Sequence, residues 1–331
     1  MTAPPTAPPT GTPLRLATFN LESLGDGDRG GPPLAPRLAA LRPLLMALEA
    51  QVLCLQEVNA AAARKKAPRR PAGLEALVAG TPYAEAARCL SLGVTGTHLA
   101  DRHNLAILSR LPLRSWQSLY HDFVRPLDLP LVGQAGARVT RSFDRPLLSA
   151  ELELSDGRLL HVVNLHLRAP LAAAFPEGKA AGAWRSTAAW AEGLHHASLL
   201  RSAQALEARL LVERIFDGDP EALIAVCGDF NAEGEAAALE ILTAPPAKTG
   251  LADSAGRSLV TLDPGLAPDR RFSLRHAGRA LMVDHILVSP ALFAGYRGLD
   301  SLNAHLIDDC ARAAGAERGS FHAPLVAEFE L

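Results

Sequence analysis

Residues 227–233 constrain this 331-residue chain more than any other part of it. They read Cys-Gly-Asp-Phe-Asn-Ala-Glu and directly follow the apolar run at 222–226. A short apolar run bounded by glycine is typical of a buried strand. Alternate residues of an extended chain point the same way, so Asp229 and Asn231 are expected to face one point in space. An acid beside an amide suits general-base chemistry, although Asp-x-Asn also builds ordinary turns.

Short apolar runs that end on a polar residue occur at four further places. Their ends carry an amide, two acids and two histidines: Asn20, Glu57, His166 and the pair Asp284 and His285. Five such ends favour strands that lie side by side and open onto one mouth, where ligands bind in sheet proteins. Neighbouring strand residues face opposite sides, so we expect His285 to be structural or peripheral.

Length and composition favour one large α/β domain. Hydrophobic residues make up 48% of the chain, which is enough for a sizeable core. The polar strand ends and a final histidine span positions 20–322, so we expect a single domain over 13–331 after a disordered, Pro/Thr-rich tail at 1–12. A net charge of −2 argues against a generally basic nucleic-acid binder but is compatible with a local phosphate-binding groove.

The cysteines and the N-terminus bear on the compartment. The four cysteines show neither CxxC pairing nor zinc-like spacing, and Cys54 and Cys227 lie in apolar runs typical of buried, reduced thiols. Residues 1–10 lack the basic start of a signal peptide, and no run approaches the roughly 18 apolar residues of a membrane span. We therefore expect a soluble cytoplasmic protein of unknown oligomeric state.

The hydrophobic periodicity predicts helices at residues 35–49, 73–79, 199–216 and 235–242. Residues 169–196 are predicted to be irregular, within an insertion over 169–198 that directly follows the strand ending at His166. The insertion holds Trp184, Trp190 and several cations. Two interpretations stay open: a lid that stacks a base or covers a head group, or packing of the insertion onto the core.

Taken in order, seven segments resemble the endonuclease/exonuclease/phosphatase superfamily, the deoxyribonuclease I-like fold, in its bacterial form. The segments are residues 18–22, 55–58, 104–109, 164–167, 228–231, 283–286 and 322–325. Each is weakly specific alone, but together they cover almost the whole chain in the family's order. The resemblance implies an α/β (α+β) four-layer sandwich, with two face-to-face mixed β-sheets flanked by helices. It also implies a divalent-metal-dependent phosphoesterase.

The resemblance also implies roles for individual residues. Glu57 is the main expected metal ligand, assisted by Asn20 and Glu22; such oxygen donors suit Mg²⁺ or Mn²⁺. His166 would protonate a leaving oxygen or hold the phosphate. Asp229 and Asn231 would orient or deprotonate the attacking water. His322 would contact the phosphate, and Asp284 would fix the tautomer of the His322 ring and favour its imidazolium form.

The expected substrate contacts are weaker interpretations. Asn104 either touches substrate or caps a turn, and Arg168 and Arg185 are candidate substrate-binding residues beside and within the 169–198 insertion. The basic run at 64–70 either lines the approach of a phosphate backbone or is a solvated loop.

One departure from the family pattern bears on function. Most relatives have aspartate before the last histidine, at or near the metal, and this chain has Phe321. Asp308, Asp309 or Glu22 is a candidate to compensate. We expect a nuclease or related phosphodiesterase that hydrolyses a phosphodiester by metal-assisted water attack, with nucleic acid or another phosphodiester as substrate. The alternatives are a phosphomonoesterase, a phosphodiesterase of lipids or small molecules, and a binding protein that has lost turnover.

Overall fold

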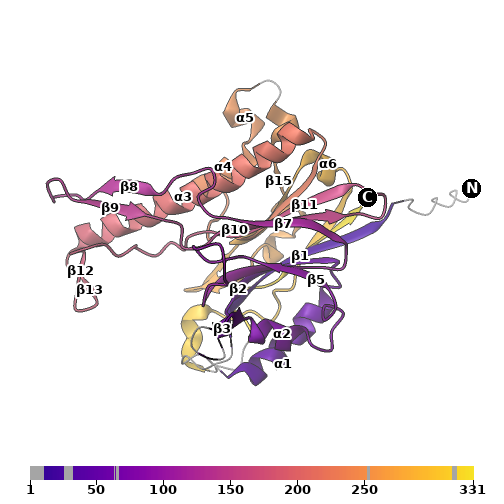
Figure 1. Ribbon diagram of the computed structural model, residues 1–331, viewed down its shortest axis with the longest axis horizontal. Helices are drawn as coiled ribbons and strands as arrows, with labels where there is room; N and C mark the ends of the chain where they lie inside the picture. The colour runs from indigo at the N-terminus through magenta and orange to yellow at the C-terminus, as the bar shows by residue number, and fades with distance from the viewer. Residues whose placement is uncertain (1–10, 26–32, 63, 65–66, 252–253, 315–318) are drawn as a thin grey trace, which may run out of the picture.

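The computed structural model describes residues 11–25, 33–62, 64, 67–251, 254–314 and 319–331, and two six-stranded mixed β-sheets lie at its centre (Figure 1). The expected tail at 1–12 lies almost entirely outside this range. The first sheet has the strand order β19-β20-β1-β2-β6-β5. Its strands are β1 (Pro13–Leu24), β2 (Val52–Val58), β5 (Ala87–Leu90), β6 (Asn104–Ser109), β19 (Tyr296–Ser301) and β20 (Leu325–Glu330).

The second sheet has the order β15-β18-β14-β11-β10-β7. Its strands are β7 (Leu113–Leu119), β10 (Leu147–Glu153), β11 (Leu159–His166), β14 (Leu223–Asp229), β15 (Val260–Thr261) and β18 (Asp284–Val288). Each sheet contains one parallel pair, β1 with β2 and β11 with β14, and its other pairs are antiparallel. The carboxyl ends of each parallel pair therefore lie at one edge of its sheet.

The two sheets bury their facing sides against each other. Leu16 and Val52 of the first sheet belong to the same apolar cluster as Val162 and Ala225 of the second. Side chains on a strand alternate between faces, so the intervening residues point outward to the helices. Removing these apolar surfaces from water is the main force that holds the sheets together.

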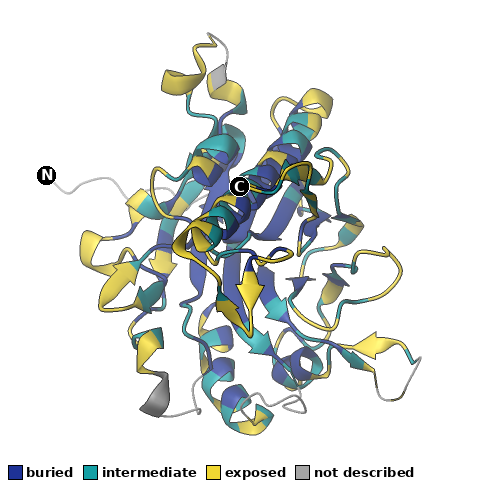
Figure 2. Cartoon of the chain, turned by 90° about the vertical axis from the view of Figure 1, so that its left-hand side faces the viewer, coloured by how far each residue is buried: buried dark blue, intermediate teal, exposed yellow. Residues whose placement is uncertain are grey.

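Helices cover the outer face of each sheet. α1 (Leu34–Ala47) and α2 (Ala72–Val78) pack on the first sheet, and α3 (Thr187–Gly218) and α4 (Ala237–Thr243) pack on the second. Burial is concentrated in the strands and in the helix faces that meet them (Figure 2). The predicted four-layer sandwich is confirmed.

The remaining elements are short and lie mostly in the connections. They are β3 (Ala61–Ala62), β4 (Arg69–Arg70), β8 (Leu127–Pro130), β9 (Arg138–Arg141), β12 (Lys179–Ala180), β13 (Ala183–Trp184), β16 (Leu274–His276), β17 (Arg279–Leu281), α5 (Pro246–Thr249), α6 (Pro290–Phe293), η1 (Ser254–Arg257), η2 (Asp263–Gly265), η3 (Pro268–Arg270) and η4 (Asp309–Ala314). Within the described residues, no helix combines the length and apolar character needed to cross a membrane.

The helix predicted at 199–216 is longer than expected. α3 runs over 32 residues, and Ser186 caps it by accepting a hydrogen bond from the Ala189 N–H at 3.0 Å. The prediction of an irregular segment at 169–196 is therefore wrong for its second part. These first turns extend past the sheet and leave Trp190 exposed, so they lack the one-sided apolar pattern by which a packed helix is found in a sequence.

The outer part of α3 and two hairpins, β8–β9 and β12–β13, project beyond the sheets (Figure 1). We call this projection, residues 125–145 and 168–196, the arm. Arg141 ties its pieces together, with one guanidinium nitrogen donating to the Ala174 carbonyl at 2.8 Å and another 3.1 Å from Nδ1 of His196. The Val132 N–H donates to Glu192 at 2.7 Å.

Candidate active site

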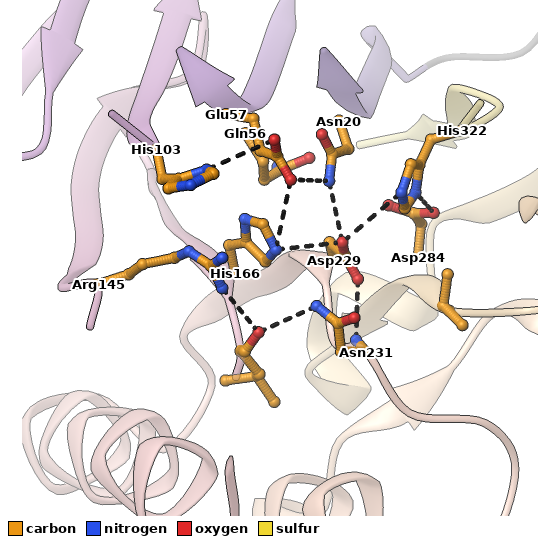
Figure 3. Close-up of polar contacts among 12 residues, drawn as sticks. Asn20, Gln56, Glu57, His103, Arg145, His166, Asp229, Asn231, Asp284 and His322 are labelled. Atoms are coloured by element: carbon orange, nitrogen blue, oxygen red, sulfur yellow. Dashed lines mark hydrogen bonds and ion pairs between the residues drawn. The ribbon is translucent and has the colours of Figure 1, made fainter. Parts of the chain in front are cut away.

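Strand register brings the polar strand ends together. In the first sheet Asn20 lies beside Gln56, the residue before Glu57. In the second sheet Asp229 lies beside both His166 and Asp284. The inner faces of the two sheets meet, so these ends ring one site (Figure 3).

Gly228 allows this close approach. It has φ +142°, and a Cβ built on it would lie 1.9 Å from the carbonyl oxygen of Leu165 on β11. A side chain at this position therefore collides with the neighbouring backbone. The glycine before Asp229 is thus required by the pairing of β14 with β11.

A layer of buried amides separates the apolar core from the site. Nε2 of Gln56 donates to Thr18 at 3.0 Å and to Asn164 of the other sheet at 2.7 Å. The Asn164 amide donates back to the carbonyls of Leu55 and Ala106, each at 3.0 Å. Buried networks of this kind fix the relative position of the elements they join.

Glu57 lies at the centre of the first sheet's contribution. Its carboxylate accepts a hydrogen bond from Ser23 at 2.9 Å, and the Asn20 amide lies 3.4 Å away. The same Asn20 amide donates to Asp229 at 2.9 Å. Asn20 therefore joins the acids of the two sheets.

Asp229 is the point where the two histidines converge. Its Oδ2 lies 3.3 Å from Nε2 of His166 and 3.9 Å from Nε2 of His322. Nδ1 of His322 is 2.7 Å from Asp284, which forms the expected pair. The Ser320 hydroxyl accepts from the His322 N–H at 3.0 Å and so fixes the backbone of that histidine.

Asn231 holds Asp229 through its backbone. Its N–H donates to Oδ1 of Asp229 at 2.9 Å, and its side-chain amide donates to the Leu167 carbonyl at 3.0 Å. β14 ends at Asp229, and Asn231 has φ +49°. The simple strand alternation expected for these two residues is therefore wrong, although they are in direct contact.

The site shifts the pKa values of Glu57 and Asp229 in opposite directions. Burial and the charge of Asp284 raise the pKa of Asp229 to about 6. Burial also opposes ionisation of Glu57, but the contacts of His103 and Ser23 with the carboxylate lower its pKa well below the ordinary value. Glu57 is therefore ionised at neutral pH, while Asp229 gains or loses its proton at a pH close to neutral.

The two histidines also differ. Burial and the charge of Arg145 hold the pKa of His166 well below its ordinary value, so this ring is neutral. Burial likewise opposes a charge on His322, but Asp284 and Asp229 raise its pKa to about 10. The site therefore presents one neutral imidazole and one imidazolium to a ligand.

Backbone strain collects around these groups. Five non-glycine residues of the site or its immediate surroundings have positive φ between 48° and 60°: Glu22, Ser23, Glu57, His103 and Asn231. Such conformations cost about 1 kcal/mol or more each and are concentrated at functional sites. The strain here supports a functional role for the strand ends.

The donor set fits a hard divalent cation. Glu57, Asp229 and Asp284 offer carboxylate oxygens, those of Asp229 and Asp284 lie within 4.8 Å of each other, and Oδ1 of Asp284 is buried without a hydrogen-bond partner. Asn20 uses its Oδ1 to accept from the Glu22 N–H at 2.8 Å and turns its amide nitrogen to the acids.

Glu22 bears on the departure at Phe321. Its carboxylate accepts from the Phe321 N–H at 3.0 Å, so this acid lies against the residue that stands in place of the aspartate expected from the family pattern. Asp308 and Asp309, the other candidates to compensate, bond to the β16–β17 hairpin.

The expected substrate-binding residues lie outside this constellation. Asn104 is 1% exposed, and its amide bonds only to backbone groups of Val58 and Ala100, as a capping role requires. Arg168 pairs with Asp144 at 2.8 Å. Arg185 follows β13 at the outer end of the arm (Figure 1) and lines a cavity of about 630 Å³ there.

Two further predictions concern residues near the site. His285 is fully buried between Asp263 and the Ala232 carbonyl, so its predicted structural role is confirmed. The basic run at 64–70 lies partly outside the described residues; Arg64, Arg69 and Arg70 are exposed.

Sequence reasoning missed His103 and Arg145. Nδ1 of His103 lies 3.4 Å from Glu57, and its ring meets His166 edge-on. Arg145 donates to the Leu167 carbonyl at 3.1 Å and faces the His166 ring (Figure 3). Neither residue ends an apolar strand, so only the polar pair His103–Asn104 at the start of β6 could have drawn attention.

A family model described as the Endonuclease/Exonuclease/phosphatase family matches residues 17–304. The chain belongs to this family. It is accordingly a phosphoester hydrolase of a family that is typically metal-dependent. No curated protein matches the sequence significantly.

Solved structures of the family share the fold at low sequence identity. A mannosyl-6-phosphatase of Bacteroides thetaiotaomicron VPI-5482 matches with TM-score 0.59 and 16% identity, over 96% of this chain and 100% of that chain. TDP2 of D. rerio complexed with single strand DNA product gives TM-score 0.56 and 14% identity, over 97% and 100%. Truncated TDP2 of Caenorhabditis elegans matches with TM-score 0.55 and 14% identity, over 96% of this chain and 98% of that chain.

Proposed function

We propose that this family member is a divalent-metal-dependent phosphodiesterase in which water attacks a phosphodiester, with nucleic acid as the leading substrate class. The observation that carries the proposal is the convergence of His166 and His322 on Asp229, beside the ionised Glu57. The carboxylate of Asp229, the imidazolium of His322 and the neutral imidazole of His166 then lie around one point. This arrangement suits the hydrolysis of a phosphate ester by water.

Asp229 is the proposed general base. Its pKa of about 6 leaves it ionised at neutral pH yet basic enough to accept a proton from water. Asn20 and the Asn231 N–H hold the carboxylate in place. Asn231 thereby orients the base and, through it, the water.

The two histidines have different proposed tasks. The imidazolium of His322, paired with Asp284, stabilises negative charge on the phosphoryl oxygens. His166 is neutral, and its Nε2 faces the acids; it holds the phosphate through a hydrogen bond.

Glu57 is the proposed main ligand of Mg²⁺ or Mn²⁺, with Glu22 as an assisting residue. Asn20 would assist indirectly, because its amide nitrogen holds the carboxylates of Glu57 and Asp229. The bound ion would supply positive charge beside the phosphate. His103, 3.4 Å from Glu57, orients the carboxylate for this task.

The arm supports a phosphodiester in a chain over a compact phosphoester. At its inner end Arg145 donates to the Leu167 carbonyl, next to His166, and its outer end carries the exposed cations Lys179 and Arg185. Lys179 lies 4.8 Å from the Trp184 ring centroid. Cations and an aromatic ring along an extended surface suit a single-stranded nucleic acid, as does the DNA product named for the D. rerio structure.

A substrate panel with matched variants tests the proposal. With Mg²⁺ or Mn²⁺, wild type is expected to hydrolyse single-stranded DNA or a small phosphodiester, and Asp229→Asn to lose at least about a thousandfold in kcat. Asp156→Asn, an exposed aspartate in the β10–β11 turn, is the control. If the protein hydrolyses only phosphomonoesters, the proposed phosphodiesterase function is wrong and the protein is a phosphatase. Inactivity on every member would support the binding protein instead.

We also propose a cytoplasmic location. Three of the four free cysteines, Cys54, Cys89 and Cys227, are buried thiols within the sheets, which is typical of proteins from reducing compartments.

A further inference from the structure

A second group of metal-ligating side chains lies on the surface away from the strand ends. It consists of His276 at the end of β16 with Asp309 and Cys310 of η4. Nδ1 of His276 is 2.8 Å from Oδ1 of Asp309 and 3.7 Å from Sγ of Cys310, and the three ligand atoms all lie within 4.8 Å of one another. The three ligand atoms are therefore close enough together to share one ion.

Asp308 builds the scaffold for this cluster. Its carboxylate accepts from the N–H groups of Ala277 at 3.1 Å and Gly278 at 2.5 Å in the β16–β17 turn, and from the Cys310 N–H at 2.9 Å. Ala277 has φ +49° and Gly278 φ +78°, the two positive values of a tight hairpin turn. The hairpin and the loop that carry the three side chains are thus held together before any ion binds.

The donor types select the ion. An imidazole nitrogen, a carboxylate oxygen and a thiolate suit the borderline-soft Zn²⁺, whereas Mg²⁺ takes oxygen ligands. Ordinary zinc bond lengths at tetrahedral angles put ligand atoms roughly 3.3–3.8 Å apart. The His276–Cys310 separation already meets this, and the His276–Asp309 pair needs to open by about half an ångström.

We propose that His276, Asp309 and Cys310 form a Zn²⁺ site with a fourth position open to water. The site is separate from the catalytic centre and does not depend on the proposed reaction. His276 is 54% exposed, so an ion reaches it from solvent. Leu274 of β16 forms a backbone bridge with His322, so zinc here would clamp the hairpin that flanks the catalytic histidine.

Thiol labelling tests the site in the full-length protein, reduced with a phosphine and saturated with Mg²⁺. Cys310 is exposed and the other three cysteines are buried, so it is the fast-reacting thiol. We expect Zn²⁺ to slow its labelling at least about tenfold in wild type. His276→Ala and Asp309→Asn are expected to lose most of this protection. His98→Ala, which removes an exposed histidine outside the cluster, should retain it.

Metal binding itself gives an independent readout. Co²⁺ used in place of zinc should give a thiolate-to-cobalt absorption band that Cys310→Ser abolishes. Competition with a chromophoric chelator should show Zn²⁺ affinity falling at least about tenfold in Cys310→Ser and His276→Ala. Circular dichroism checks that the variants fold. Equal labelling rates with and without Zn²⁺, or unchanged affinity in both variants, would overturn the proposal.

Discussion

Asp229 occupies the position on which the polar contacts of the site converge. It is buried, it contacts Asn20 and the Asn231 N–H, and it lies within 4 Å of both histidines. Burial and Asp284 raise its pKa to about 6. A carboxylate in water titrates about two units lower, so the fold itself supplies a base that is useful near neutral pH.

The pH profile of kcat/KM should therefore be bell-shaped. Activity is expected to rise with pH as Asp229 ionises near 6 and to fall as His322 loses its proton near 10. Asp284 raises the pKa of both groups, so Asp284→Asn should move both limbs to lower pH. Rates of a small phosphodiester at saturating Mg²⁺ would show this. A basic limb that stays in place would contradict the role of Asp284.

His103 should matter through Glu57. Removing its ring in His103→Ala is expected to raise the Mg²⁺ concentration needed for half-maximal activity by about tenfold, because Glu57 loses a positioning contact. Mg²⁺ titrations of activity measure this. His98→Ala, which changes an exposed histidine, should behave as wild type. An unchanged Mg²⁺ requirement in His103→Ala would remove His103 from the site.

Among the elements, the parallel strand pairs decide where the site forms. In the pairs β1 with β2 and β11 with β14, both strands end at the same edge of their sheet. Their register places Asn20 beside Gln56 and His166 beside Asp229. This arrangement requires β14 to run close to β11, and Gly228 is where the two backbones nearly touch.

Gly228→Ala should destabilise the protein by about 3 kcal/mol or more, because its methyl group meets the Leu165 carbonyl. Gly298→Ala on β19 is the matched control: a Cβ there meets nothing within 4 Å, and stability should change by less than about 1 kcal/mol. Urea unfolding of both variants measures the difference. Equal stabilities would show that β14 and β11 are not this tightly paired.

Across the whole molecule, sequence patterns predicted the sandwich and much of the site. Period-two alternation and polar strand ends correctly placed Asn20, His166, Asp229 and Asp284 at one mouth. They failed where backbone leaves the regular pattern, as at Asn231, or where an element leaves the sheet, as in the first turns of α3. His103 and Arg145 join the site from loops, through contacts with segments far away in the chain, which no local pattern encodes.

The arm should control the response to large substrates. Lys179→Ala with Arg185→Ala is expected to weaken binding of single-stranded DNA and to flatten its salt dependence. Hydrolysis of a small phosphodiester should stay unchanged, because both residues lie on the outer arm (Figure 1). Titrations of labelled oligonucleotide at several salt concentrations test this. DNA binding with an unaltered salt slope would exclude these two cations from the substrate surface.

The most direct measurement is Mg²⁺-dependent hydrolysis of a phosphodiester by the purified protein, compared with Asp229→Asn and Asp156→Asn. Metal-dependent turnover in wild type and Asp156→Asn that disappears in Asp229→Asn is the predicted result. Turnover that survives in Asp229→Asn, or needs no divalent cation, would contradict a metal-dependent reaction at the ring of strand ends.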